Sequence, residues 1–102
     1  ELILRQTDNY EIAVYHAHQA IEKAIKARLL KEGRTFKFVH DLEALCRQLP
    51  DGIIDEKLRD DLAFVNALYP TLRYPGGDLI TRDQAEKSVL SAKEIVSRVK
   101  AP

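Results

Sequence analysis

Three histidines and a single cysteine are the first residues to consider for chemistry in this chain. His16 and His18 point about 200° apart around a helix, so they cannot bind one metal ion together. His18 and Glu22 have the i,i+4 spacing of a ligand pair, but the sequence offers no evident third ligand. We therefore expect neither a metal site nor any other cofactor.

Cys46 falls on the apolar stripe of a predicted helix, which favours a buried structural thiol over a nucleophile. A lone cysteine excludes an internal disulfide and is typical of a reducing cytoplasm. Gly76-Gly77 is not followed by Lys-Ser or Lys-Thr, so the sequence has no phosphate-gripping P-loop. By themselves these residues give no positive indication of an enzyme.

One group of candidate binding residues, polar and mostly basic, lies along a predicted helix. His16, Gln19, Lys23 and Lys26 are spaced i, i+3, i+7 and i+10, which puts them on one side of that helix. With the nearby Arg28 and Lys31, this stripe could hold a phosphate or a carboxylate. The alternative is an ordinary solvated face.

A second candidate is the segment of residues 72–76, in which Arg73 and Tyr74 follow a helix ended by Pro70. A planar cation beside an aromatic ring can stack on a base and grip a phosphate. The alternative is that Arg73 hydrogen-bonds carbonyls left open at the end of the helix.

Charge and composition limit the class of protein. Sixteen basic and sixteen acidic residues cancel, unlike in a nucleic-acid binder that works by bulk charge. The distribution is uneven: residues 22–37 hold six basic and two acidic residues (+4), and residues 41–62 hold three basic and seven acidic residues (−4). With no apolar run near 18 residues and no signal peptide, we expect no membrane contact and a cytoplasmic location.

Helix periodicity and capping residues predict the elements that carry these groups. The first long helix runs from Asp8 or Asn9 to Glu32, and Gly33 closes it. A short helix follows Asp41, another covers 55–69, and Thr81 with Gln84 forms a capping box for a helix that ends near residue 100. Residues 1–6 read as the tail of an earlier helix. The whole chain, 1–102, is predicted to be one all-α domain, an antiparallel up-and-down bundle of four to five helices.

Three motifs follow one another along the chain: A-x-Q-A-x-E-K-A-x-K-A after an aromatic residue, then His40-Asp41-Leu42, then Arg73-Tyr74-Pro75. Together they resemble the HEPN family, the higher eukaryote and prokaryote nucleotide-binding domains. Residues 10–27, YEIAVYHAHQAIEKAIKA, resemble the family's aromatic followed by A-x-Q-A-x-E-K-A-x-K-A. His40-Asp41-Leu42 and Arg73-Tyr74-Pro75 match two further motifs, and residues 85–99 match its amphipathic last helix. The resemblance spans nearly the whole chain.

The resemblance implies a bundle of about five helices, the first of which is cut in this chain. It also implies a homodimer, or pairing with a minimal nucleotidyltransferase as in toxin–antitoxin or defence systems. Some branches of the family are metal-independent ribonucleases that use an Arg and a His with four to six residues between them. Here no histidine follows Arg73, and the one formal match, Arg34 and His40, falls in a predicted loop.

The sequence therefore favours a non-catalytic, dimeric binding module for a nucleotide, an RNA end or a partner nucleotidyltransferase. Arg73 and Tyr74 are the expected ligand contacts, and Lys23 and Lys26 the expected phosphate contacts. One alternative is a ribonuclease toxin that uses Arg34 and His40. Another is a purely structural dimer or antitoxin component without a small-molecule ligand.

Overall fold

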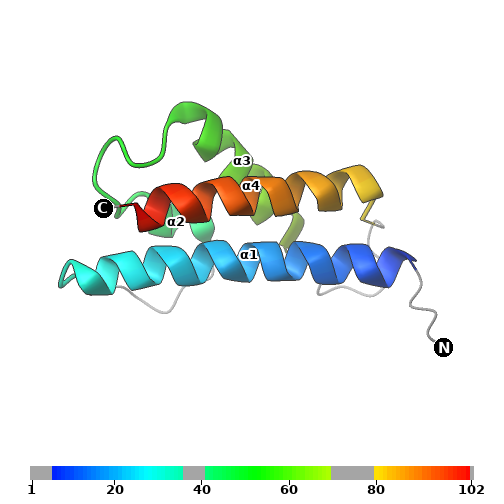
Figure 1. The fold of residues 1–102 in the computed structure, drawn as a ribbon, viewed down its shortest axis with the longest axis horizontal. Coiled ribbons are helices and arrows are strands. Elements are labelled where there is room, and N and C mark those ends of the chain that lie inside the picture. The colour runs from blue at the N-terminus through cyan, green and yellow to red at the C-terminus, as the bar shows by residue number, and fades with distance from the viewer. Residues whose placement is uncertain (1–5, 36–40, 70–79, 102) are drawn as a thin grey trace.

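Four helices make up the computed structural model, which describes residues 6–35, 41–69 and 80–101 (Figure 1). They are α1 (Gln6–Lys31), α2 (Leu42–Cys46), α3 (Glu56–Leu68) and α4 (Arg82–Lys100). The described residues contain no strand, and the predicted all-α bundle is confirmed. The predicted helix tail at the start of the chain lies outside the described residues, except for Gln6, which belongs to α1.

Except at the start of α1, the helix ends are fixed by the capping residues that the sequence indicates. α1 begins at Gln6, so Asp8 and Asn9, the predicted first residues, lie within the helix. The Asp41 carboxylate accepts hydrogen bonds from the Glu43 and Ala44 amides, and the Asp55 carboxylate accepts one from the Leu58 amide. Thr81 and Gln84 form the predicted reciprocal capping box at the start of α4. Gly33 adopts a positive φ of 74° just after α1, where a side chain would be strained.

The directions of the helices do not strictly alternate. α1 and α4 lie side by side and run the same way, and α3 runs opposite to both (Figure 1). The start of α3 lies near the end of α4: Lys57 is 3.5 Å from Glu94, and Asp55 is 3.8 Å from Arg98. Within the described residues, the bundle is therefore antiparallel between α3 and the other two long helices, and parallel between α1 and α4.

The core lies where α1 meets the other three helices. Its fully buried aliphatic side chains come from every helix: Ile21, Ile25, Leu29, Leu42, Leu45, Leu58, Leu62, Val65, Ile95 and Val99. Val14 packs in a smaller cluster with Ile80 and Ala85. Ala17, Ala24 and Ala92 are buried as well. Small side chains let two helix axes approach closely, so α1 and α4 pack along much of their lengths.

Arg28 ties the ends of α1 and α4 together. Its Nη1 donates hydrogen bonds to the Val99 and Ala101 carbonyls, at 2.8 and 2.9 Å, and its Nε donates to the Glu32 carboxylate at 2.8 Å. The carbonyls at the end of a helix lack partners within the helix and carry partial negative charge, which a guanidinium satisfies.

We predict that Arg28→Ala lowers the free energy of unfolding by about 1–3 kcal/mol, because carbonyls at the end of α4 lose a charged donor. Urea unfolding followed by circular dichroism measures the change. Lys31→Ala is the matched control, since Lys31 is exposed on the same helix and forms no ion pair with a described residue. A loss in Arg28→Ala no larger than in the control would contradict this role.

Candidate functional site

The predicted polar stripe lies on the outer side of α1. His16 and Lys23 are exposed there, and Gln19 and Lys26 are half-buried. Lys23 forms no ion pair with any residue that the structure describes. The Lys26 ammonium, by contrast, lies 2.7 Å from the Glu22 carboxylate. The two lysines therefore share one side of α1, but Lys26 already holds an anion and Lys23 does not.

A buried polar row runs beside this stripe. His18 is fully buried and Glu22 is 5% exposed, and their Nδ1 and Oε1 atoms are 3.7 Å apart. A buried carboxylate is costly unless charges or donors compensate it, and Lys26 supplies that compensation from one turn along the helix. As predicted, the two neighbouring histidines diverge: His16 faces solvent and His18 faces the interior. Within the described ranges, no three side chains of metal-ligating type come together.

Three rings join α1 to the end of α3. The Tyr69 ring stacks on the His18 ring, with centroids 3.8 Å apart and planes inclined by 20°. Tyr15 lies nearly parallel to Tyr69, with centroids 6.4 Å apart, and 45% of Tyr15 is exposed. These three rings were not predicted to meet. The i,i+3 spacing of Tyr15 and His18 was visible, but their contact with Tyr69 depends on the path of the chain.

Of the other candidate residues, the structure describes Arg34 and Cys46 but not His40, Arg73 and Tyr74. Arg34 is exposed; its guanidinium donates a hydrogen bond to the Gln48 carbonyl and lies 3.7 Å from the Glu32 carboxylate. His40, Arg73 and Tyr74 lie outside the described residues, so their predicted roles stay predictions. Cys46 is buried, as predicted, and burial raises the pKa of its thiol above the usual value, which disfavours a reactive thiolate.

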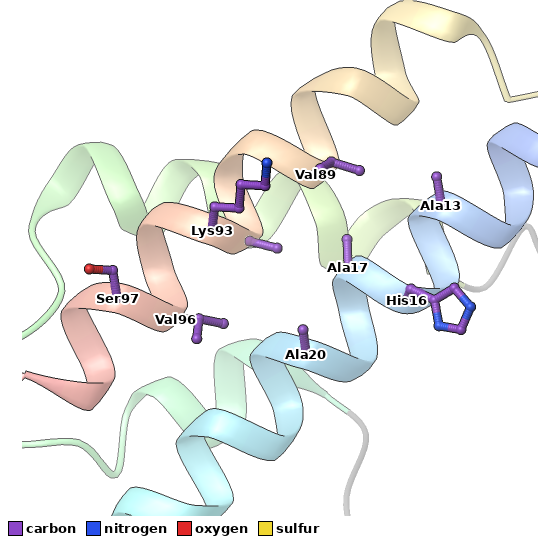
Figure 2. A pocket seen from close by; sticks show the side chains of 9 residues that line it. Ala13, His16, Ala17, Ala20, Val89, Lys93, Val96 and Ser97 are labelled. Atoms are coloured by element: carbon purple, nitrogen blue, oxygen red, sulfur yellow. The ribbon is translucent and has the colours of Figure 1, made fainter.

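An apolar groove lies between α1 and α4, next to the polar stripe, with which it shares His16 (Figure 2). It has a volume of about 490 Å³. Figure 2 shows the methyls of Ala13, Ala17 and Ala20 along one side and Val89 and Val96 along the other. His16, Lys93 and Ser97 also line it, and Lys93 is exposed.

A second hollow, of about 410 Å³, continues the groove toward the start of both helices. It shares Ala13 and Val89 with the first, and Leu90 lines it. Leu90 itself is 65% exposed. An open apolar groove beside an exposed leucine is a surface on which another protein chain can pack.

Comparison with known proteins gives one positive result. Residues 2–101 match the model of the HEPN domain family, which is nearly the whole chain. No curated protein and no solved structure gives a significant match. No described helix has the length and apolar composition that crossing a membrane requires.

Proposed function

The chain belongs to the HEPN domain family, and from that premise we propose that it is a non-catalytic, dimeric binding module. It binds a nucleotide or an RNA end, or a partner minimal nucleotidyltransferase of a toxin–antitoxin or defence pair. Family membership supports a role connected with nucleotides or RNA. Arg73 and Tyr74 are the proposed ligand contacts, and Lys23 and Lys26 the proposed phosphate contacts.

The exposed ammonium of Lys23 is the observation that carries the binding role. It stands on the polar side of α1, next to Gln19 and Lys26, and has no acidic partner among the described residues. A phosphate can therefore approach Lys23 without displacing an existing ion pair. Lys26 contributes to phosphate binding while it stays paired with Glu22. The Glu22 carboxylate fixes the position of the Lys26 ammonium but offsets part of its positive charge.

The ligand assignment predicts that Arg73→Ala weakens binding at least tenfold, since a charged hydrogen bond to phosphate contributes about 1.5–3 kcal/mol. Thermal unfolding with ATP, GTP or a short single-stranded RNA detects binding, because a ligand at 100 times its Kd stabilises the fold by about 2.7 kcal/mol. Arg59→Ala, an exposed arginine on α3, is the control. Unchanged affinity of Arg73→Ala for every nucleotide, RNA and partner protein would remove that residue from the site. No shift with any ligand would favour the purely structural dimer.

The non-catalytic assignment rests on how the candidate chemical groups are engaged. The Arg34 guanidinium is bound to the Gln48 carbonyl and lies near Glu32, and the Cys46 thiol is buried. An arginine that stabilises a developing charge on RNA must instead be directed at the substrate.

We predict that RNA stays intact when it is incubated with the purified protein in the presence of a chelator. The His40→Ala variant, treated side by side, gives the same result. Cleavage by the wild type alone would contradict the proposal and make Arg34 and His40 an active site. Gel electrophoresis of a labelled RNA measures both outcomes.

A second copy of the chain is the proposed occupant of the groove between α1 and α4. Glu86, Leu90 and Lys93 lie on one side of α4, at i, i+4 and i+7, and all three are exposed. Glu86 and Lys93 are equally distant in sequence from the point between Val89 and Leu90. A two-fold axis at that point, with two α4 helices antiparallel, brings each Glu86 to the partner's Lys93.

The same two-fold axis also places the exposed Leu90 opposite the apolar groove. Leu90 of each copy lies over the apolar groove of the other, so that one surface supplies both the protruding side chain and the hollow. A self-complementary surface of this kind is what a two-fold dimer requires. Opposite charges at the rim fix the direction in which the helices pair.

Charge reversal tests this dimer. Glu86→Lys and Lys93→Glu should each raise the dimer dissociation constant about tenfold or more, because like charges then face each other twice. The double variant, Glu86→Lys with Lys93→Glu, should dimerise nearly as well as the wild type. Sedimentation equilibrium measures the constants, and Asp60→Lys, on the exposed side of α3, is the control. A dimer that resists both single changes uses another surface.

A further inference from the structure

The exposed ring of Tyr15 is unexplained by the fold and by the dimer. We propose that Tyr15 is a base-stacking residue for single-stranded RNA, and that the strand lies along α1 with a phosphate on Lys23. The inference rests on the proposed function, because it names the class of ligand and the residue that contacts a base.

The orientation of the Tyr15 ring is set by its neighbours. Tyr69 stacks on the buried His18 ring at 3.8 Å, and Tyr15 lies nearly parallel to Tyr69 at an inclination of 20°. His16 meets the Tyr15 ring edge-on, with centroids 5.7 Å apart. A ring that is packed against others and still 45% exposed loses little conformational entropy when a base stacks on it.

The spacing along α1 indicates a strand rather than a single nucleotide. Tyr15, Gln19 and Lys23 follow one another at four-residue steps and form one ridge on the helix surface. Lys23 is therefore about 12 Å along the helix axis from Tyr15. This separation of the two backbone positions is longer than the distance from a base to its own phosphate. It therefore favours a base on Tyr15 and a phosphate on Lys23 that belong to different nucleotides.

The charges along the ridge also favour a strand over a nucleoside triphosphate. A triphosphate concentrates several negative charges at one place and needs converging cations. Among the described residues on this side of α1, Lys23 is the one cation without an acidic partner, since Lys26 is 2.7 Å from the Glu22 carboxylate. One cation matches the single charge of each phosphate in a strand. Gln19 lies between Tyr15 and Lys23, and its amide can donate hydrogen bonds to a base edge and accept hydrogen bonds from it.

The aromatic cluster also links the two groups of ligand contacts that the sequence predicts. Tyr69, which contacts Tyr15 and His18, precedes Arg73 and Tyr74 by only four and five residues in the sequence. Lys23 lies on the same helix as Tyr15, eight residues later. In the sequence, the residues of the aromatic cluster therefore lie close to both groups of predicted ligand contacts.

The test uses fluorescence anisotropy of a labelled single-stranded oligouridylate with the whole protein. Tyr15→Ala should weaken binding about tenfold, and Tyr15→Phe should bind like the wild type, because phenylalanine keeps the stacking face. Lys23→Ala should weaken binding and lower the slope of log affinity against log salt by about 0.7. Leu30→Ala, exposed on the same helix, and Arg59→Ala, an exposed cation on α3, are the controls and should change neither quantity.

Tyrosine emission gives a second measurement, since the chain has four tyrosines and no tryptophan. Stacking of a base on Tyr15 should quench part of this emission. Tyr15→Phe should keep the affinity and lose that part of the quenching, which a purely structural role of Tyr15 does not predict. Circular dichroism of each variant checks that the fold is intact.

Each opposing result has a distinct meaning. Wild-type affinity in Tyr15→Ala overturns the inference, and if Arg73→Ala still weakens binding, the proposed function stands without it. Binding of UTP as tight as that of the oligouridylate indicates a single-nucleotide ligand and also overturns the inference. A wild type that binds neither RNA nor any nucleotide removes the inference together with the ligand-binding part of the proposed function.

Discussion

The close packing of α1 against α4 is the constraint on which the rest of the structure depends. Buried alanines at positions 17, 24 and 92 keep the two helices near each other. Because the helices run in the same direction, their ends coincide, and Arg28 of α1 can reach the Val99 and Ala101 carbonyls at the end of α4. The same small side chains leave the outer side of the helix pair hollow. One packing choice thus produces a tight contact inside and an apolar groove outside.

α1 faces three different surroundings: the core, the contact and groove with α4, and solvent. This explains why apolar residues cover an unusually wide arc of its surface. Its large aliphatic residues, Ile21, Ile25 and Leu29, fill the core. Its alanines line the contact and the groove with α4. Its remaining side carries Tyr15, Gln19 and Lys23 toward solvent. The proposed dimer surface and the proposed RNA surface therefore lie on adjacent sides of one helix and meet at His16, which lines the groove and contacts the Tyr15 ring.

The buried side chains of His18 and Glu22 hold residues that lie nearer the surface of α1. Burying a carboxylate and an imidazole costs free energy, and replacement of such groups by apolar ones is often neutral or stabilising. Their presence here is consistent with a positioning role: Glu22 fixes the Lys26 ammonium at 2.7 Å, and His18 supports the Tyr69 ring at 3.8 Å. Through Tyr69, the core of the bundle sets the orientation of the exposed Tyr15 ring.

The sequence by itself determined the helices, their caps and the family. Asp41, Asp55, Thr81 and Gly33 act through contacts with residues a few positions away, so their effects follow from the local order of residues. Burial of Cys46 was predictable for the same reason, because the apolar side of a helix follows from its periodicity.

Only the tertiary structure decided the parallel course of α1 and α4, the groove between them, the grip of Arg28 on α4 and the stacking of Tyr69 on His18. Each of these joins residues far apart in the sequence. Such contacts depend on where the connecting segments lead the chain, and helical periodicity carries no information about that path.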